Sequence, residues 1–302
     1  MAYIHKYSTI AKGNTFKKGI ILGHIKSQQK LLIHPDYKEV IPNANLRRSP
    51  LIVKMGLANA IKCIDNKKIN AIVVATGLAS IDNSEKFLSS ILDSETSLLS
   101  PTPFINSVHN TISGEIALHT KNQGYNSTYS QGPLSFSGAI LDAMILAKEN
   151  YNVILGAVDE TPPALDSERK LNKPKKNTKF DTGSSFFQIT NKKDGSLAKI
   201  VDCIITKKEN LNYYLKNFDS KQDIILSGNS FVDYQIDNKE INYSKFSGIY
   251  MTNHAFGLQL SIEILNEQPE KINNHRIPKK INQIFVINYA SKNDVSIIIV
   301  KK

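Results

Sequence analysis

Two continuous apolar runs constrain the fold of this chain more than any other sequence feature. They occupy residues 69–77 and 151–158, and both are rich in Val, Ile, Leu and Ala. Runs of this length, bounded by polar residues or Gly, predict strands that are covered on both faces. Apolar residues at helical spacing precede them over 50–66 and 135–150. Strands that alternate with helices in this way indicate an α/β fold with largely buried sheets.

The rest of the chain continues this alternation. We expect helices from about residue 83, with Ser84 as N-cap, and over 113–120 and about 255–265, and strands over 185–190, 198–206, 223–228, 284–288 and 295–300. The polar loop between the last two strands fits a hairpin. Pro, Lys and Asn dominate from about 161 to 179, which predicts an exposed connection. The organisation we expect is two similar α/β halves packed together, over 1–165 and 183–302, joined by a connection over 166–182.

Composition and charge set the class of protein only broadly. Hydrophobic residues make up 41% of the 302 residues, which is enough for a sizeable core. The net charge is +11, but the basic residues are scattered, which favours a solvated surface over a nucleic-acid groove. A basic rim would also suit an acidic partner. The start of the chain has no long apolar run, and no stretch approaches the roughly 20 apolar residues of a membrane span. We therefore expect a cytoplasmic protein.

The two cysteines are poor candidates for chemistry. Cys63 and Cys203 both lie among apolar residues of expected helices or strands, where a free Cys usually behaves as a small hydrophobic residue. Their spacing is not that of metal ligands. We predict neither a metal site nor a resident cofactor.

Residues 124–139 have the form in which an acyl-transfer enzyme presents a nucleophile. An extended segment over Tyr125–Tyr129 runs into a sharp turn and then into a helix rich in small residues. Such a junction exposes one side chain near a helix N-terminus, where backbone N–H groups favour negative charge. An ordinary strand–turn–helix connection has the same pattern, so these residues alone leave both interpretations open.

Several further segments match one known family: TPFINSVHN at 102–110, GEIAL at 114–118, Ser135-Phe136 with Ala143, GAVDE at 156–160, RRSP at 47–50 with VKMG at 53–56, and GSSFF at 183–187. On these segments the chain resembles the β-ketoacyl synthases, and especially the divergent synthase-like proteins of aryl-polyene and flexirubin-type pigment pathways. The resemblance implies a thiolase-like fold, in which two similar βαβ-type halves form layers in the order α-β-α-β-α. The chain is shorter than typical synthases, which implies trimmed loops and caps.

In that family a Cys opens the helix that follows the sharp turn. Counting back from 156–159 without gaps places its equivalent at Gln131, and a slip of one residue would give Ser130 or Gly132. None of the three is Cys, and a Gln amide cannot form a thioester, although it can present a carbonyl and an NH₂ group. The chain-length-factor subunits of type II polyketide systems carry Gln at this place and pair with a competent synthase. The resemblance implies that Gln131 fills a degenerate site.

The histidines bear on the same question. A working synthase of this family needs two histidines in its second half. The first should follow the strand that ends near Gly228. Asn229 stands there instead, and residues 229–233 contain no His. The second is matched by His254, although Asn253 replaces the family's Gly before it. A remnant active-site role and a packing role both remain open for His254, and a structural and a proton-transfer role both remain open for His109.

Several side chains near Gln131 are expected to line a substrate pocket, namely Ser135, Phe136 and Phe104. In a chain-length factor, bulky residues around a buried tunnel set how long the acyl chain grows, although an aromatic residue at helical spacing is also compatible with a core. Asp159 and Glu160 end an expected buried strand, where we favour structural roles for both carboxylates.

Together these features predict a catalytically degenerate, chain-length-factor-like subunit of a β-ketoacyl synthase, acting in polyene, polyketide or fatty-acid-like chain elongation. The expected partners are a catalytic ketosynthase subunit and an acyl carrier protein, whose phosphopantetheine would carry the acyl groups. The family dimerises by continuing a strand across a two-fold axis, and the sequence leaves heterodimer and homodimer open. Two alternatives also remain: a stand-alone malonyl-carrier decarboxylase or acyltransferase that uses the Gln site, and a structural thiolase-fold partner protein without a pocket function.

Overall fold

The computed structural model describes residues 1–13, 15–18, 31–41, 49–64, 68–93, 99–161, 181–229, 237 and 240–302. Residues 166–180 of the expected connection, and the resembling pair Arg47 and Arg48, lie outside these ranges. The strands are β1 (Ala2–Ile10), β2 (Ala71–Ala75), β3 (Tyr125–Tyr129), β4 (Val153–Asp159), β5 (Gly183–Thr190), β6 (Ala198–Lys207), β7 (Asp223–Asn229), β8 (Ile241–Asn242), β9 (Lys271–Ile272), β10 (His275–Arg276), β11 (Gln283–Tyr289) and β12 (Asp294–Lys301). The α-helices are α1 (Thr15–Lys18), α2 (Tyr37–Val40), α3 (Leu51–Cys63), α4 (Ile81–Asp93), α5 (Pro101–Ser107), α6 (Thr111–Thr120), α7 (Ser135–Lys148), α9 (Leu211–Tyr214), α10 (Ser244–Ser247) and α11 (His254–Glu267). Two 3₁₀ turns are η3 (Gly132–Leu134) and η4 (Lys208–Asn210).

Ten strands form one sheet in the order β3-β2-β4-β5-β1-β6-β12-β11-β7-β8. When the first five strands and the last five are each numbered in chain order, both sets read 3-2-4-5-1 from the outer edge to the centre. The two sets meet where β1 pairs antiparallel with β6 through Ala2–Ile200, Tyr3–Lys199 and Ile4–Ala198. The chain is therefore a topological duplication, and the expectation of two similar α/β halves is confirmed.

The pairing of β5 defines where one half gives way to the other. This strand lies between β4 and β1 and runs antiparallel to both, so it belongs with the first five strands. The boundary between the two halves therefore falls between Thr190 and Ala198, and not before residue 183 as the sequence pattern predicts. Local sequence patterns identify a strand but carry no record of its distant partners, which explains this difference.

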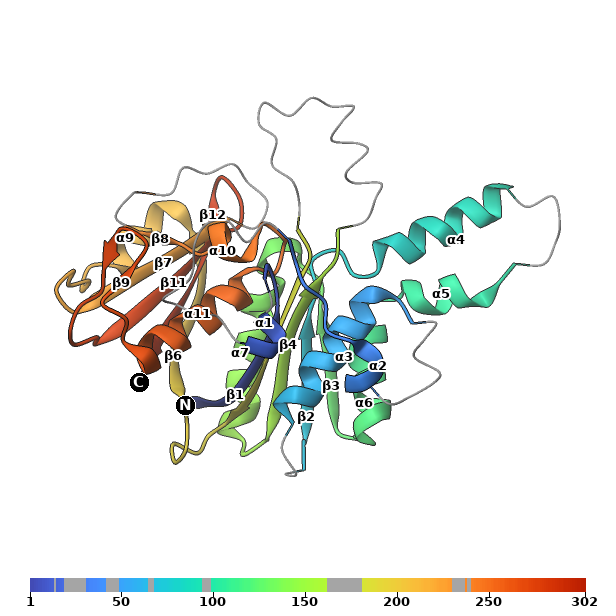
Figure 1. Ribbon diagram of the computed structural model, residues 1–302, viewed down its shortest axis with the longest axis horizontal. Coiled ribbons are helices and arrows are strands. Elements are labelled where there is room, and N and C mark those ends of the chain that lie inside the picture. Colours follow the sequence, from blue (N-terminus) through green and yellow to red (C-terminus); the bar gives the residue numbers. More distant parts are fainter. Residues whose placement is uncertain are drawn as a thin grey trace.

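Helices cover the sheet in layers (Figure 1). In the first half α3 packs on β1, β4 and β5, and α6 packs on β2 and β3. α7 packs on the same strands and also contacts α11, which in turn packs on β7, β11 and β12. Residues of α9 and the turn after it close an outer apolar cluster with β11 and β12. The two halves of the single ten-stranded sheet thus lie on either side of the central helices α7 and α11, with further helices outside them, which is the layered α/β architecture that we expected.

The alternation of side chains along each strand supplies these layers. On β4, Leu155 and Ala157 enter the central cluster around α7 and α11, whereas Ile154 and Val158 enter the outer cluster under α3. Successive side chains of a strand point to opposite faces, so a strand between two helix layers must be apolar at every position. This is why the run over 151–158 looked continuous in the sequence.

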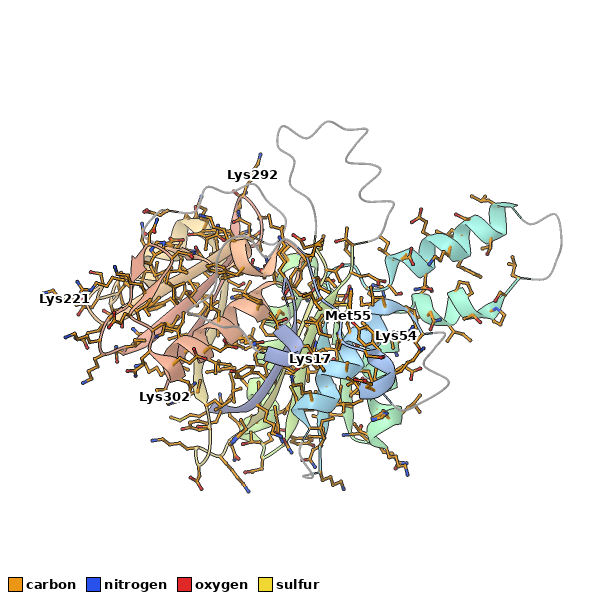
Figure 2. All side chains as sticks on the ribbon, viewed as in Figure 1. Lys17, Lys54, Met55, Lys221, Lys292 and Lys302 are labelled. Carbon is orange, nitrogen blue, oxygen red and sulfur yellow. The ribbon has the colours of Figure 1, made fainter. Side chains whose placement is uncertain are left out.

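Three smaller observations complete the fold. α4 begins at Ile81, so Ser84 lies inside the helix and the N-cap expected there is wrong. Within the described ranges, no helix is both long enough and apolar enough to span a bilayer. Figure 2 shows Lys221, Lys292 and Lys302 extending from separate sides of the molecule, in keeping with a scattered positive charge.

Candidate functional site

The candidate site lies where the parallel strands of the first half end. β2 pairs parallel with β3 on one side and with β4 on the other, so the carboxyl ends of all three meet at one end of the sheet. Side chains that follow such strands converge, and this end is where open α/β sheets usually carry their sites. The chain leaves β3 at this end, passes Gln131 and enters α7.

The turn around Gln131 is held by a small set of hydrogen bonds. The backbone N–H of Gln131 donates to Ser135 Oγ (2.7 Å), and Ser135 Oγ donates to the Gly132 carbonyl (2.7 Å). Gly132 has φ +57°, a left-handed conformation that Gly adopts without steric cost. Asn288 on β11 donates from Nδ2 to the Pro133 carbonyl (2.9 Å), which links this turn to the second half.

The expected nucleophile position is exposed. A 3₁₀ turn separates Gln131 from α7, and its side chain is solvent-accessible. Its Oε1 lies beside Gly138, where an added Cβ would be 3.1 Å away. Tyr125, Leu141 and Ile145, all more than a third exposed, lie along β3 and α7. We call Tyr125, Gln131, Leu141 and Ile145 the edge face.

The three residues expected to line a pocket with Gln131 occupy different environments. Ser135 is fully buried and its hydroxyl serves the turn. Phe136 is fully buried and packs in the core against Phe187, with ring centroids 6.0 Å apart. Phe104 is 55% exposed and packs against Phe87 of α4 at 5.2 Å. The structure therefore brings Ser135 close to Gln131 but places Phe104 in a separate helical hairpin.

His254 is a core residue in this structure. It is fully buried at the start of α11, with Nε2 3.1 Å from the Val286 carbonyl and Nδ1 3.3 Å from Ser137 Oγ and 3.4 Å from Ser296 Oγ. A ring nitrogen facing a carbonyl must donate, so Nε2 carries the hydrogen and Nδ1 accepts. Burial lowers the pKa of His254 to about 4, although the bond to Val286 opposes that shift. The imidazole is therefore neutral at pH 7 and joins α7, β11 and β12.

His109 lies in the turn between α5 and α6 and is exposed to solvent. The helices on either side of it pack against each other. This position is in neither the Gln131 turn nor the buried surroundings of His254, so the structure does not assemble the three residues into one constellation.

Met251 is a site residue that the sequence did not single out. An added Cβ at Gly77, at the end of β2, would lie 2.2 Å from Met251 Cβ. The sulfur of Met251 also approaches the Gln131 turn, 3.9 Å from the Cβ position of Gly132. Met251 thus fills the space between the end of β2 and the start of η3. Its place three residues before His254 was the available signal, but an apolar residue in a loop suggested no chemistry.

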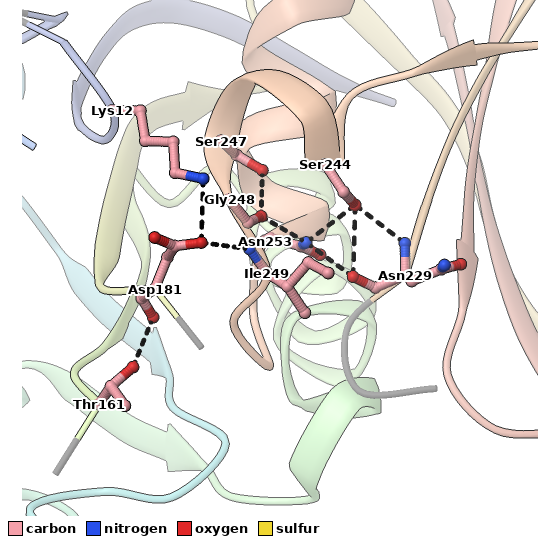
Figure 3. A network of polar contacts seen from close by, with 9 residues as sticks. All are labelled: Lys12, Thr161, Asp181, Asn229, Ser244, Ser247, Gly248, Ile249 and Asn253. Atoms are coloured by element: carbon pink, nitrogen blue, oxygen red, sulfur yellow. Dashed lines mark hydrogen bonds and ion pairs between the residues drawn. The ribbon is translucent and has the colours of Figure 1, made fainter. Parts of the chain in front are cut away.

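Asn253 organises the end of β7, where the resembling family has its first histidine (Figure 3). Its Nδ2 lies within hydrogen-bonding distance of the Asn229 carbonyl (2.9 Å), Ser244 Oγ (3.2 Å) and the Gly248 carbonyl (3.1 Å). The backbone N–H of Asn229 in turn donates to Ser244 Oγ (2.9 Å). A buried network of amides, hydroxyls and carbonyls therefore fixes the approach to α11.

Asp181 extends this network towards the first half (Figure 3). One of its carboxylate oxygens accepts from the Ile249 N–H (3.2 Å) and from Lys12 Nζ (3.1 Å). Its carbonyl accepts from Thr161 Oγ1 (2.9 Å). These contacts connect the loop before α11 to β1, β4 and β5.

Asp159 joins the two halves directly. Its Oδ1 accepts from the Thr76 hydroxyl (3.0 Å) and from the Gly77 and Leu78 N–H groups, and its Oδ2 accepts from the Thr252 N–H (2.8 Å) and hydroxyl (2.7 Å). Burial raises the pKa of Asp159, and these donors oppose the rise. Donors to a carboxylate favour its charged form. The structural role favoured from the sequence fits these contacts.

Glu160 lies beside the start of α4, and its carboxyl group has fewer hydrogen-bond donors around it than that of Asp159. Its Oε1 is buried and makes no hydrogen bond within the described part of the chain. Burial, with the nearby charge of Asp82, raises the pKa of Glu160 to about 7, although a bond from the Ile52 N–H at the start of α3 opposes the rise. This carboxyl group therefore titrates near neutral pH.

Both cysteines are buried packing residues and are not candidates for thiolate chemistry. Cys63 Sγ donates to the Phe186 carbonyl (3.2 Å), and Cys203 Sγ donates to the Ser137 carbonyl (3.6 Å). Both are buried, and burial raises the pKa of the Cys203 thiol well above its usual range. The groups around Gln131 can donate and accept hydrogen bonds, but those in the described part of the chain include neither a thiol nor a pair of histidines.

With the geometry described, the family can be assigned. Residues 26–175 match the family model described as "Beta-ketoacyl synthase, N-terminal domain". The chain is a β-ketoacyl synthase-like protein of the thiolase fold. No protein with a curated description matches it.

Solved structures share the fold of this β-ketoacyl synthase-like chain, two of them over nearly its whole length. A chain from the complex titled "AntDE:AntF (apo): type II PKS acyl-carrier protein in complex with its ketosynthase bound to the hexaketide" is 13% identical, with 99% of each chain covered and a TM-score of 0.78. A chain of the ishigamide ketosynthase/chain length factor is 9% identical, with 99% and 98% covered and a TM-score of 0.73. A chain of the ketosynthase–chain length factor complex of Xenorhabdus doucetiae is 17% identical, with 68% and 83% covered and a TM-score of 0.53. At these identities the likeness concerns the fold.

Proposed function

We propose that this protein is a chain-length-factor-like subunit, catalytically degenerate on its own, that pairs with a competent ketosynthase in polyketide-type or polyene chain elongation. The observation that carries the proposal is the start of α7, where an exposed Gln131 occupies the turn that would present a nucleophile. The other half of the machinery is also replaced, since His254 is neutral and enclosed in the core and Asn229 stands at the end of β7.

The edge face supports pairing with another subunit. β3 is one of the two outer strands of the sheet, and among the described residues it pairs on one side only, which leaves the other side for strand addition. Tyr125, Leu141 and Ile145 are 39%, 37% and 56% exposed, so apolar surface flanks the free side of β3. A partner that continued the sheet along β3 would cover these side chains and would enclose Gln131 between the two subunits.

Gln131 then contributes to a pocket that the partner completes. Its carboxamide can donate and accept, so it can position a carbonyl or hydroxyl of a growing chain without forming a covalent bond. The acyl groups would arrive on the phosphopantetheine of an acyl carrier protein in the cytoplasm, and the partner's own site would carry out the condensation. The solved complexes of ketosynthases with chain length factors support this arrangement by analogy of fold.

The test begins with the native complex. Tagged protein is purified from its native host, and a ketosynthase with an intact Cys–His–His site is expected to co-purify in equal amounts. Each purified subunit is then incubated with an acyl-carrier thioester and examined by intact mass spectrometry. The partner is expected to gain the acyl mass, and this chain is not.

Two outcomes would contradict the proposal. One is a stable acyl adduct on this chain alone. The other is CO₂ release from malonyl-carrier protein by this chain alone, lost in a Gln131→Ala variant, which would instead indicate the decarboxylase alternative.

A further inference from the structure

The hairpin of α4 and α5 is the least enclosed part of the described molecule. Figure 1 shows the two helices extending away from the body on the side that carries α6. They hold each other through the rings of Phe87 and Phe104, 5.2 Å apart, and α5 also packs on α6. A pair of short helices with so little support needs a further surface to bury its apolar side chains.

Large apolar side chains of this hairpin face solvent. The exposed fractions are 59% for Leu88, 85% for Leu92, 55% for Phe104, 61% for Ile105 and 44% for Val108. Contiguous exposed apolar surface on a soluble protein usually marks a binding site. We call the segment Ile81–Asp93 with Pro101–Ser107 the arm.

The arm is an addition to one half only. In the first half, residues 76–124 connect the second strand to the third, whereas in the second half residues 230–240 make the equivalent connection. Both halves build the same sheet order, so the fold itself does not require the arm. Its apolar surface therefore needs a different explanation from core packing.

The base of the arm is fixed to the edge strand. α6 follows the arm, and its Ser113 Oγ lies 2.9 Å from Thr128 Oγ1 on β3. Asn126 Nδ2, also on β3, donates to the Ser113 carbonyl (2.9 Å). The arm also leaves the sheet at the carboxyl end of β2, where Gln131 lies. A subunit that paired along β3 would therefore meet the arm directly.

Charge also distinguishes the arm from the rest of the chain. The arm contains three Asp or Glu and one Lys, in a chain of net charge +11. An acidic amphipathic hairpin is repelled by the anionic surface of a membrane. It suits a protein surface with an apolar groove and a basic rim.

We propose that the arm binds the partner ketosynthase subunit, inserting Leu88, Leu92 and Ile105 into an apolar groove with a basic rim. This inference rests on the proposed function, because it requires the partner that pairs along β3. The arm then adds affinity to the pairing and selects partners by the shape and charge of their groove. The edge face and the arm act as two parts of one interface.

The experiment measures affinity for the co-purified ketosynthase by calorimetry. The arm variant is Leu88→Ser/Leu92→Ser/Ile105→Ser, which changes only side chains that are more than half exposed. The matched control is Tyr213→Ser, 64% exposed on α9 in the other half. The arm variant is expected to bind at least tenfold more weakly, and the control to bind as the natural chain does. Hydrogen exchange of amides 87–92 is expected to slow when the ketosynthase is added.

An edge variant, Leu141→Asp/Ile145→Asp, separates the two ideas. If the edge variant loses binding while the arm variant binds within twofold of the natural chain and amides 87–92 gain no protection, the arm proposal is overturned and the proposed function stands. If the natural chain itself does not bind the ketosynthase, both fail. If the natural chain floats with vesicles of phosphatidylglycerol and phosphatidylethanolamine, and only the arm variant does not, the arm is a membrane-binding element and the proposal is overturned.

Discussion

The starts of α7 and α11 hold equivalent places in the two halves, and they differ in almost every property. Each helix precedes the fourth strand of its half in the common 3-2-4-5-1 order. Gln131, before α7, is exposed beside an edge strand, whereas Asn253 and His254, at α11, are buried among hydrogen-bond partners. The same topology therefore occurs twice. At these equivalent positions, however, the first half exposes Gln131 to solvent, whereas the second half buries Asn253 and His254 among hydrogen-bond partners.

The largest effect is expected at Asp159, which connects the end of β2 to the loop before α11. Asp159→Ala would leave the donors from Thr76, Gly77 and Thr252 without an acceptor, at a cost of about 3 kcal/mol or more in the free energy of unfolding. Urea denaturation measures this loss. Asp294→Asn, which alters an exposed pair with Lys207, is the control and should cost far less, because water screens an exposed ion pair. Equal effects of the two changes would mean that Asp159 does not hold the halves together.

A second effect is expected from the burial of His254. Its pKa is about 4 in the folded chain, against about 6.5 when unfolded, so the unfolded chain binds the extra proton between these values. The resulting stability is fully present above about pH 6.5 and is lost as the pH falls towards 4, by roughly 2–3 kcal/mol. Unfolding is measured from pH 7 to 4 for the natural chain and for His254→Gln. The variant should be less stable at pH 7 but should lose less stability on acidification. Parallel pH profiles would show that the imidazole is not enclosed.

A smaller effect of opposite sign is expected at Glu160, beside the base of the arm. Its folded pKa of about 7 exceeds the unfolded value of about 4.3, so the folded chain favours the protonated form. The contribution of Glu160 to the free energy of unfolding is then greatest below about pH 4 and falls as the pH rises to 7. Glu160→Gln should therefore be more stable than the natural chain at pH 8, by about 1 kcal/mol, with the difference shrinking towards pH 4. A thermal melt at each pH measures this, and a constant difference would contradict it.

The smallest effect is expected at Gln131 itself. Because its side chain is exposed and its backbone makes the turn's hydrogen bonds, Gln131→Ala should change the free energy of unfolding by less than about 0.5 kcal/mol. Ser135→Ala, which removes the hydroxyl that holds the same turn, is the matched comparison and should cost about 1–2 kcal/mol. A large loss with Gln131→Ala would mean that the side chain is structural, and the contrast between the two starts would weaken.

The sequence was a good guide wherever burial alone determines the pattern. The runs over 69–77 and 151–158 became β2 and β4, and the extended segment Tyr125–Tyr129 became β3 with the same bounds. Periodicity reports that a residue is covered, but it does not report what covers it. Phe136 could line a tunnel or fill a core on that information, and the structure places it against Phe187.

The site was less predictable because it depends on contacts between distant segments. The position of Gln131 followed from counting residues, but its exposure depends on β3 being an outer strand of the sheet. Met251 reaches the Gln131 turn only because α11 packs against α7. Helix α5, with Pro at positions 101 and 103 and no clear periodicity, gave no signal of the arm.

The position of β1 in the sheet affects the order in which the chain can fold during synthesis. β1 is made well before both of its neighbours in the sheet, which are β5, at residues 183–190, and β6, through residues 198–200. Until residues 183–190 have left the ribosome, this strand lacks the sheet partners that it has in the described structure. Pairings this distant along the chain form slowly and leave strand edges open to aggregation. The N-terminal strand therefore closes the first half late and joins it to the second in the same event, so a nascent chain cut short before residue 183 would expose Ala2–Ile10 to chaperones.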